Sequence, residues 1–544
     1  MGVNEPIIPR SFTLLSLHAS RFTFHDSRYI DVTMNARTKA DAFLKISSQF
    51  RLGELDTEKP HPKTTELSFL VQTDLLKAID ILKEIDVEAL DIVRKRSKQI
   101  IGMKRDIEKT FHNGHKIYLI GCGSTGRLSL VLEVLWRKLR AGTKYEHSLV
   151  SLMAGGDTAL IRSIEGFEDY PAFAVRQLQE LGFSEGDLLI ACTEGGETPF
   201  VIGATEYATE ISGNSPYFLY CNPDEILLGL TDRTTRILKN SGVNRINLSV
   251  GPMGISGSTR MQSSTVLMYA VGIALLNSFE DINIERDVDY FINYMVDVDF
   301  DFLAGYIDKE YNIYKSGSYL SYLTDDDLGI SILTDTTERS PTFTLDPFNN
   351  YLKENQKPSL SYLYMPDCAD SLSAWKSMLF RDPRPLNWSE YPVTMDSYLS
   401  GFDFSREGLE KRIKKVHPAR CEIFEIIRSE SGFAFNLQNE IHHIPIEGLT
   451  LLHQHLLLKM MLNILSTLIM GKLGRYETNL MTYVTPSNNK LIDRAARYAG
   501  ILLEREGVKA SYEDIVYALY EEMEKGIGTR SLVLDTVKRI TEGK

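Results

Sequence analysis

Residues 117–134, "IYLIGCGSTGRLSLVLEV", contain the pattern that decides the fold of the first half of this chain. An apolar run leads into a glycine-rich turn at residues 121–126, and a helical pattern follows the turn. Glycines allow the backbone to turn tightly, and the free amides of a helix N-terminus attract anions. The stretch therefore predicts a strand, a turn and a helix, with an anion such as a phosphate held at the turn.

Short apolar runs recur along the first half and predict the strands of one sheet. They lie at residues 116–120, 148–153, 187–192, 217–221 and 245–250, and helical patterns separate the first four of them. This alternation is typical of an α/β protein whose parallel sheet has helices on both faces. A further helical pattern at residues 64–110 predicts helices before the sheet. Ligands of such sheets bind at the carboxyl ends of the strands.

Three polar loops follow predicted strands and are candidates for that ligand site. They are "GCGSTGR" at 121–127, "CTEGGETPF" at 192–200 and "GPMGISGSTRM" at 251–261. In the second loop Thr198 is placed to cap a helix that has Pro199 at its first position. Loops of this composition offer amides and hydroxyls without fixed positive charge, which suits a phosphate or a sugar.

Two nucleotide-binding alternatives are less well supported by the sequence. "GCGSTG" matches the dinucleotide pattern GxGxxG, but the acidic residue expected after the second strand, Asp157, comes late and behind two glycines. The first loop also lacks the GxxxxGK[ST] pattern of nucleoside triphosphate sites. A sugar phosphate is therefore the preferred ligand.

Composition narrows the class of partner. The chain has 544 residues, enough for about three domains, and 60 Lys and Arg against 73 Asp and Glu give a net charge of -13. This balance argues against nucleic acid or an anionic membrane surface as the main partner. The 5 cysteines lack paired spacing, and no leader or long apolar segment is evident, so a cytoplasmic location is expected. The sequence predicts no metal and no cofactor.

The second half of the chain repeats features of the first. Tyr118 and Leu119 before the first loop are matched by Tyr322 and Leu323 before "TDDDLG" at 324–329. The second loop of this pair has three aspartates where the first has Gly, Ser and Thr, and three carboxylates would repel a phosphate. Two copies of one fold in a chain normally pack about a pseudo-twofold axis. We therefore predict a pseudo-dimer in which only the loops of the first copy can bind a phosphate.

The motifs of the first half resemble the sugar isomerase (SIS) domain of N-acetylmuramic acid 6-phosphate etherases. That family has motifs of the form GAGTSGRL, AGG…VE..ED, SGRTPY, CNP and GSSRMK. This chain has GCGSTGRL (121–128), AGGDTALIRSIEGFED (154–169), GGETPF (195–200), CNP (221–223) and GSTRMQ (257–262). The resemblance implies an α/β fold of three-layer domains, each with a central parallel sheet.

The second copy lacks the phosphate loop, but it retains two family residues that the first copy lacks. The family glutamate of LDASECPPTF corresponds to Leu135 in the first copy and to Glu338 in the second. The family lysine of QKLVLNMLST corresponds to Met268 in the first copy and to Lys459 in the second. Since the etherases are homodimers with sites at the subunit interface, the resemblance implies one composite site between the two copies.

The arrangement as a whole resembles the glucokinase regulatory proteins, which have two SIS domains and a C-terminal helical cap and bind fructose phosphates. "TERSPTF" (337–343) and "AWKSMLFRDPRPLNW" (374–388) are most similar to that group. The implied organisation is an N-terminal extension at 1–60, a first SIS domain at 61–300, a second at 301–484 and a cap at 485–544. A pseudo-dimer within one chain implies a monomer.

The predicted ligand site draws on both copies. Thr193 and Thr198, with the amides of Gly195 and Gly196, are expected to hold the phosphate, and Lys459 to supply the cation. The hydroxyls and backbone of the first and third loops complete the predicted set, which adds Gly123, Ser124, Thr125, Ser258 and Thr259. The resemblance implies that Glu165 and Glu338 either bind sugar hydroxyls or act as acid and base.

The main functional hypothesis is a regulator that senses a hexose phosphate similar to fructose 6-phosphate, with a sugar kinase as the implied partner. The alternative is an enzyme, either an etherase-type carbon–oxygen lyase acting on an amino-sugar 6-phosphate or a phosphosugar isomerase. Three departures from the family bear on the ligand: Glu194 and Glu197 in the second loop, and Met253 in the third. We expect the Glu197 charge to point outward, or the ligand to differ.

Overall fold

The first sheet is parallel throughout, as the sequence predicts. The computed structural model describes residues 35–543 except 51, 163, 165, 354, 355, 487 and 527–529. The strand order is β2-β1-β3-β4-β5, and all neighbours pair in parallel. The strands are β1 (Ile117–Gly121), β2 (Leu149–Met153), β3 (Leu188–Cys192), β4 (Tyr217–Tyr220) and β5 (Asn244–Asn247). The predicted strands are all present, although β5 ends earlier than the apolar run does.

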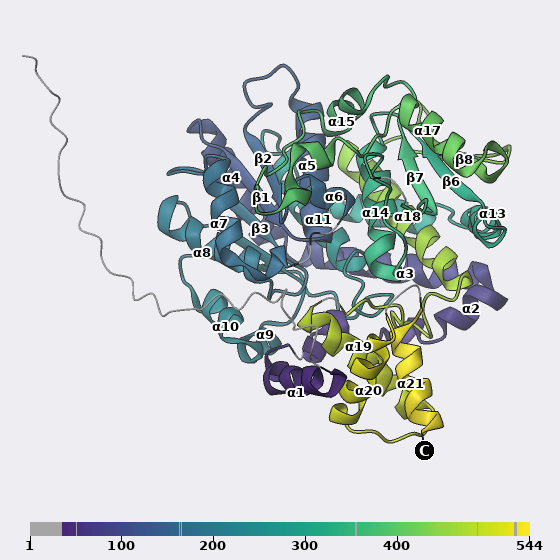
Figure 1. The fold of residues 1–544 in the computed structure, drawn as a ribbon. Coiled ribbons are helices and arrows are strands. Elements are labelled where there is room, and N and C mark those ends of the chain that lie inside the picture. Colours follow the sequence, from purple (N-terminus) through teal and green to yellow (C-terminus); the bar gives the residue numbers. More distant parts are fainter. Residues whose placement is uncertain are drawn as a thin grey trace, which may run out of the picture.

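Helices cover both faces of this sheet (Figure 1). Tyr118 and Ile120 of β1 pack into a core with α7 (Pro171–Glu180) and α8 (Pro199–Ile211). The alternate residues Ile117 and Leu119 belong to the other core, which contains α5 (Ser124–Arg140) and α11 (Gln262–Leu276). A sheet buried on both faces needs apolar residues at every strand position, which explains the continuous apolar runs in the sequence.

The second sheet has the strand order β10-β9-β8-β6-β7. Read from β7 to β10, this order matches that of the first sheet from β2 to β5, so that β6 takes the place of β1 and β8 the place of β3. Its strands are β6 (Tyr319–Leu323), β7 (Ser361–Tyr364), β8 (Cys421–Arg428), β9 (Gly432–Leu437) and β10 (Glu440–Pro445). The strand β6 pairs in parallel with β7 and β8, whereas β8, β9 and β10 are antiparallel.

The mixed direction of the second sheet differs from the parallel sheet that the SIS resemblance implies for this half. Its cause is the length of the connections, because parallel neighbours need a long crossover and antiparallel ones can be joined by a tight turn. Gln438 and Asn439 link β9 to β10 with φ values of 54° and 64°. Positive φ at both central residues is typical of a two-residue hairpin.

The two halves share one hydrophobic core. We call residues 61–300 the first unit and residues 301–484 the second unit. The helix α14 (Gly329–Phe343) packs on α5, and α18 (Leu451–Lys472) packs on α11. Each of these pairs joins helices that hold equivalent places in the two units. Every residue of α11 is buried. The core that begins on one face of the first sheet therefore continues into the second unit.

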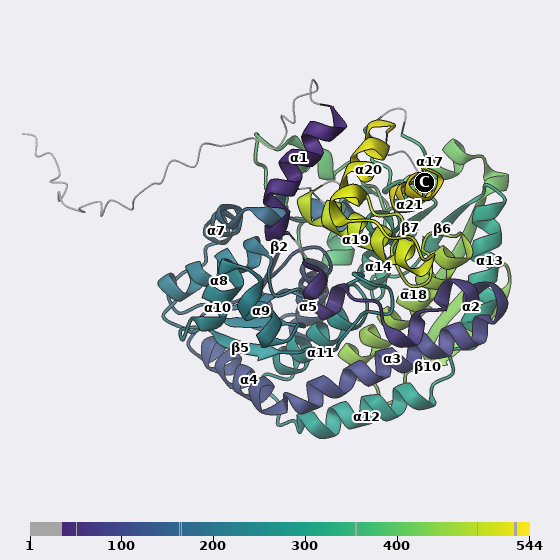
Figure 2. The same ribbon diagram turned by 90° about the horizontal axis from the view of Figure 1, so that it is seen from below.

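Further helices surround this core, and helices at the C-terminus form a bundle that packs on it (Figure 2). The helices α19 (Asn489–Arg505), α20 (Tyr512–Glu524) and α21 (Leu532–Glu542) contact one another, and α1 (Ala36–Ile46) packs on α20. The other helices are α2 (Leu67–Thr73), α3 (Leu75–Lys95), α4 (Ser97–His112), α6 (Thr158–Ile161), α9 (Asp224–Leu230), α10 (Asp232–Lys239), α12 (Ile284–Asp297), α13 (Leu303–Lys315), α15 (Ser371–Leu379), α16 (Asp396–Leu399) and α17 (Arg406–Val416). The exact domain boundaries stay a prediction.

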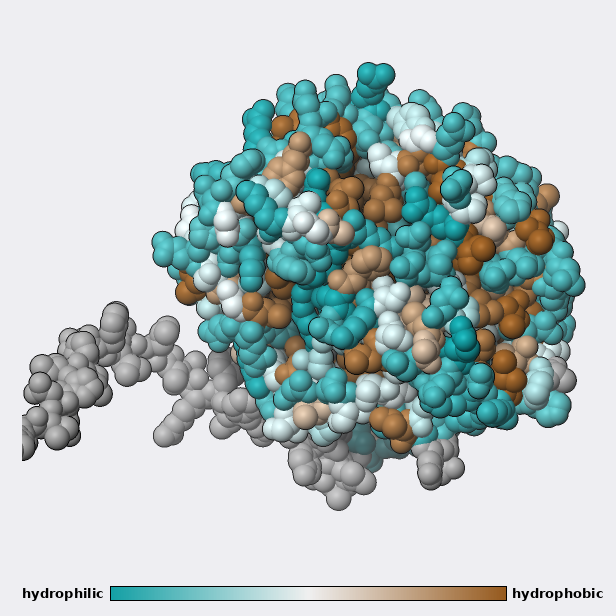
Figure 3. All heavy atoms as spheres, turned by 90° about the horizontal axis from the view of Figure 1, so that it is seen from above, coloured by the Kyte–Doolittle hydropathy of each residue, from teal (hydrophilic) through white to brown (hydrophobic). Residues whose placement is uncertain are grey.

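The face shown in Figure 3 is mainly hydrophilic, with hydrophobic residues in groups between polar ones. No helix within the described ranges is both long enough and apolar enough to cross a membrane.

A buried cluster of charges joins the two units beside β2. Glu133 of α5 is fully buried and accepts hydrogen bonds from Arg381 (3.1 Å) and Arg384 (2.8 Å) of the second unit. Arg137 also donates to Glu133, at 3.1 Å. Arg381 donates in addition to Asp157, at 2.6 Å. Burial alone raises the pKa of Glu133, but the nearby guanidinium groups outweigh it and hold the pKa at about 2.

This cluster predicts a loss of stability in acid. The pKa of Glu133 falls from 4.5 to about 2 on folding, so its stabilisation is complete above pH 4.5 and is lost as the pH falls toward 2. The difference corresponds to about 3 kcal/mol. Glu133→Gln should lower the free energy of unfolding by about 3–5 kcal/mol at pH 7, because the guanidinium groups lose their shared carboxylate.

The measurement is urea unfolding of both proteins between pH 7 and pH 3. The difference in unfolding free energy between them should narrow as the pH falls, since below pH 4.5 the Glu133 carboxyl is protonated in the unfolded wild type but stays ionised in the folded protein. Glu280→Gln, at a side chain that is 58% exposed, is the matched control and should behave as the wild type does. A gap that stays constant with pH would show that the charge of Glu133 is not what stabilises the cluster.

Candidate functional site

The first loop is shaped by glycine at the end of β1. A Cβ on Gly121 would lie 2.4 Å from the backbone of Thr125, so only glycine fits. The Thr125 hydroxyl accepts from the Cys122 amide (3.0 Å) and donates to the Cys122 carbonyl (2.9 Å). Thr125 is thus engaged in fixing its own loop, and Gly123 next to it has a φ of 52°. Ser124, the first residue of α5, lines a cavity instead.

The second loop brings four of the predicted residues together at the end of β3. The Gly196 amide donates to the Thr193 hydroxyl (3.2 Å), which also contacts the Thr198 hydroxyl at 3.0 Å. Thr198 precedes α8 as predicted, but its hydroxyl makes this contact and does not cap the helix. Asn222 donates to the carbonyl of Gly195 at 3.2 Å and so ties the loop to the end of β4.

The third loop is held in place by the second unit. Ser258 is buried, and its hydroxyl has no hydrogen-bond partner among the described residues. The Thr259 carbonyl accepts from the Ser263 hydroxyl at 3.0 Å. Arg260 extends into the second unit and donates to Asp335 at 2.9 Å. Met253, one of the three departures from the family, is fully buried against Ser263.

A narrow cavity between the two units contains residues from both. It is lined by Ser124, Arg127, Leu128 and Val131 of α5, Ser264 and Met268 of α11, Ser331, Thr334 and Glu338 of α14, and Lys459 of α18. Three predicted site residues that are far apart in the sequence, Ser124, Glu338 and Lys459, therefore line one cavity. A second hollow, near Lys309 and Glu422 on the second unit, contains none of the predicted residues.

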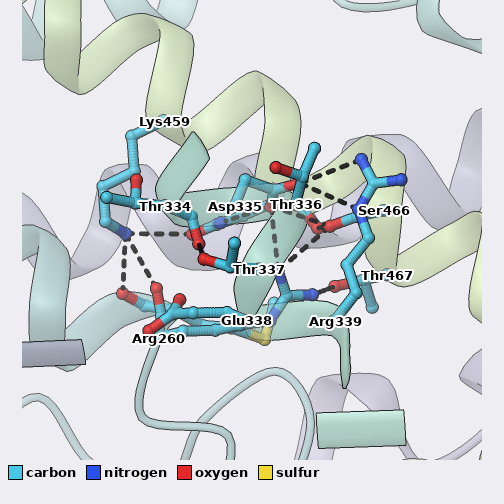
Figure 4. A network of polar contacts seen from close by, with 12 residues as sticks. Arg260, Thr334, Asp335, Thr336, Thr337, Glu338, Arg339, Lys459, Ser466 and Thr467 are labelled. Atoms are coloured by element: carbon cyan, nitrogen blue, oxygen red, sulfur yellow. Dashed lines mark hydrogen bonds and ion pairs between the residues drawn. The ribbon is translucent and has the colours of Figure 1, made fainter. Parts of the chain in front are cut away.

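Lys459 is more heavily engaged than the sequence suggested (Figure 4). Its amine donates to the Arg260 carbonyl (2.8 Å), the Thr265 hydroxyl (2.8 Å) and the Asn463 side chain (2.9 Å). These bonds use all three protons of an ammonium group. Burial lowers the pKa of Lys459 to about 8, although Asp86 and Glu338 oppose this shift. Lys459 braces the third loop here, and its contact with a phosphate stays a prediction.

Glu338 is buried on the face of α14 that turns toward α5. Its carboxylate lies 3.7 Å from the Arg127 guanidinium, which also donates to the carbonyl of Leu160 at 3.2 Å. Thr334, one turn earlier, lines the same cavity. The side chain of Glu338 is 11% exposed, so it remains accessible from the cavity. Glu165, its predicted partner from the first unit, lies outside the described residues.

Glu197 keeps its charge inside the protein, contrary to the expected outward orientation. It is buried and pairs with Arg233 and with Lys490 of α19, each at 2.9 Å. Burial alone raises the pKa of Glu197, but these two cations outweigh it and lower the pKa. Sequence reasoning missed Lys490. Two glutamates in a phosphate loop signal that a cation must be near, but nothing in the sequence shows that it comes from the C-terminal helices.

A second buried network crosses the interface beneath the third loop (Figure 4). Asp335 accepts from Arg260 at 2.9 Å and from Arg339 at 2.9 Å. Arg339 also donates to Glu310 at 2.6 Å. Ser466 of α18 completes the arrangement by donating to Asp335 at 2.9 Å. The sequence analysis did not identify these residues, because their pairing depends on how the two units pack.

The fold and the loops place this chain among the sugar isomerase (SIS) domain proteins. The model of the glucokinase regulatory protein N-terminal SIS domain matches residues 99–209. The chain is 32% identical over 253 residues to the N-acetylmuramic acid 6-phosphate etherase of Mesorhizobium japonicum. The aligned region covers 45% of this chain and 74% of that protein. The chain belongs to the N-acetylmuramic acid 6-phosphate etherase family.

Other relatives give a similar picture. The etherase of Rhizobium rhizogenes is 31% identical over 250 residues, covering 45% of this chain and 73% of that protein. The etherase of Clostridium botulinum strain Okra is 29% identical over 219 residues, covering 39% of this chain and 65% of that protein. The chain thus spans about two thirds of the length of the Clostridium protein.

Among solved structures, the chain is similar to two proteins at low identity. One is the C-terminal domain of glucosamine-fructose-6-phosphate aminotransferase from Francisella tularensis, with a TM-score of 0.38, 11% identity, and coverage of 71% of this chain and 96% of that chain. The other is phosphoheptose isomerase from Neisseria gonorrhoeae, with a TM-score of 0.26, 16% identity, and coverage of 38% and 98%.

Proposed function

We propose that this protein binds an amino-sugar 6-phosphate between its two units and releases lactate from N-acetylmuramic acid 6-phosphate. The observation that carries the proposal is that Ser124 of the first unit and Glu338 of the second line one cavity. It is supported by the etherase relatives, which align with up to 45% of this chain. These findings favour the enzyme over the regulator that we first expected.

The phosphate is best accommodated by the second loop. Its hydroxyls at Thr193 and Thr198 lie next to the N-terminus of α8, where free amides and the helix dipole favour an anion. Lys490 adds a positive charge close to the loop, although Glu197 shares it. Ser124 and the cavity beyond it then receive the sugar. In this proposal the sugar ring extends toward Glu338, which lines that cavity.

The proposed reaction needs a base and an acid. A base removes the proton from the carbon beside the carbonyl carbon of the open-chain sugar. The electron pair forms a carbon–carbon double bond, the bond to the lactyl oxygen breaks, and an acid gives a proton to the departing lactate. Water then adds to the double bond, so that a hydroxyl group takes the place of the lactyl ether. Glu338 is positioned to serve in one of these roles, and the resemblance assigns Glu165 to the other.

The test is to incubate the purified protein with N-acetylmuramic acid 6-phosphate and to follow D-lactate with a coupled enzyme assay. We expect lactate release that is proportional to protein concentration and saturates with substrate. N-acetylglucosamine 6-phosphate, which has no lactyl ether, is the control substrate and should give none. Tight binding of N-acetylmuramic acid 6-phosphate without lactate release would overturn the lyase proposal.

A second candidate function is a sugar-phosphate sensor of the glucokinase regulatory type. The observation that favours it is the ion pair between Glu197 in the second loop and Lys490 in the C-terminal bundle. A ligand phosphate would compete with Glu197 for Lys490 and could alter the position of the bundle. Thermal stabilisation by fructose 6-phosphate, in a protein that releases no lactate, would support this candidate. A sugar kinase as its partner stays a prediction.

A further inference from the structure

Glu194 is a buried acid whose carboxylate forms no ion pair among the described residues. It follows Thr193 in the second loop and directly precedes the stretch at 195–200 that matches the family motif SGRTPY. The residue is 8% exposed, and one of its carboxyl oxygens has no hydrogen-bond partner among the described residues. Ser124, which lines the cavity, lies close enough to the carboxyl to lower its pKa. Glu194 therefore connects the phosphate loop to the sugar cavity.

The groups that face Glu194 come from several elements. Glu338 of α14 repels its negative charge, and Lys490 of α19 attracts it. The thiols of Cys122, Cys192 and Cys221, at the ends of three neighbouring strands, also face it. Burial raises the pKa of each of these thiols, so they stay neutral. Lys490 is the cation that attracts Glu194 most strongly, and it already pairs with Glu197.

A buried carboxyl in this setting keeps its proton to a pH well above the usual range. Burial, with a smaller contribution from Glu338, raises the pKa of Glu194 from 4.5 to about 8. At pH 7 the side chain is a neutral acid, which can donate one hydrogen bond and accept others. Above pH 8 it becomes an anion within the loop that is proposed to hold a phosphate.

We propose that Glu194 is a specificity-determining residue that must be neutral for an anionic sugar phosphate to bind. This inference rests on the proposed phosphosugar site and adds a condition to it. A sugar phosphate is mostly dianionic above pH 7, since the second phosphate pKa is about 6. An ionised Glu194 would repel that dianion at close range, whereas the neutral acid offers it a hydrogen bond. Binding and protonation of Glu194 are therefore coupled.

The coupling has a defined size. If only the neutral form binds, the dissociation constant rises with the ionised fraction of Glu194, which gives a weakening of about tenfold between pH 7 and pH 9 for a pKa of about 8. Lys459 also loses its proton in this range, because burial lowers its pKa to about 8. Its deprotonation would weaken anion binding in the same direction, so the experiment must separate the two groups.

The experiment measures the dissociation constant of N-acetylglucosamine 6-phosphate by calorimetry at pH 7 and pH 9. This probe has no lactyl group to lose, so the protein does not consume it. For each variant the readout is the ratio of the two constants, in which any change of absolute affinity cancels. Glu194→Gln keeps the shape of the side chain without its titration and should reduce the ratio about tenfold relative to the wild type.

Two comparisons make the result specific. In Lys459→Met the dissociation constant should still rise about tenfold between pH 7 and pH 9, because Glu194 still titrates. Glu206→Gln, which removes a charge from the far part of α8, should leave the ratio as in the wild type. If Glu194→Gln keeps the wild-type ratio, this inference is wrong while the proposed site stands. If the wild type binds the probe at neither pH, the proposed function fails and the inference fails with it.

Discussion

Replacing Glu338 by glutamine should lower the rate of D-lactate release from N-acetylmuramic acid 6-phosphate by about 10²–10⁴-fold, the usual contribution of a positioned acid or base. Gln has nearly the same shape but cannot take up or release a proton. Glu338 is the acidic residue that lines the cavity between the two units, within the described part of the chain. The initial rate at saturating substrate is the quantity to measure.

The control for this variant is Glu407→Gln, which removes a carboxylate of the second unit that is 66% exposed on α17. Its rate should match that of the wild type. Glu338→Asp keeps the carboxylate but moves it by one methylene, so its rate should fall between those of the wild type and the glutamine variant. A glutamine variant with the full rate would show that Glu338 only fills space in the cavity.

Replacing Asp335 by asparagine should lower the free energy of unfolding by about 3–5 kcal/mol, because it leaves a buried cation without its partner. Arg260 and Asp335 are both 2% exposed and lie 2.9 Å apart across the interface of the two units. Arg339 keeps Glu310 as a second partner, whereas Arg260 has Asp335 as its one anionic contact among the described residues. The midpoint of urea unfolding at pH 7 measures the change.

A double variant makes this prediction more specific. Removing both members of a buried pair costs less than removing one, because no uncompensated charge remains. Asp335→Leu combined with Arg260→Met should therefore be more stable than Asp335→Leu alone. Asp301→Asn, at an exposed acidic residue, should stay within about 0.5 kcal/mol of the wild type. An Asp335→Asn protein that unfolds at the wild-type midpoint would contradict the prediction.

The first sheet could be predicted from the sequence because its signals are local. Buried parallel strands are apolar at every position, and residues 117–121 and 188–192 show this directly. The turn after β1 needs glycine at position 121 for steric reasons, so the motif itself reports the backbone path. The second sheet was harder, since the direction of β9 and β10 depends on short turns rather than on the apolar pattern.

The candidate site was predictable only in part. The loss of the family Glu and Lys from the first copy, together with the loss of the phosphate loop from the second, led to Glu338 and Lys459, which do line one cavity. The partners of Lys459 and the pairing of Glu197 with Lys490 could not be predicted. These contacts join residues that are hundreds of positions apart, and a charge in the sequence does not indicate which distant charge will neutralise it.

The placement of α11 against α18 has a consequence for dissecting this protein. Every residue of α11 is buried, and part of that burial is provided by the second unit. A fragment that ends near residue 300 would expose this apolar helix to water, so we expect it to aggregate or to pair with another copy of itself. We expect that neither half can be purified alone as a stable monomer. Co-expression of the two halves should restore the folded two-unit protein.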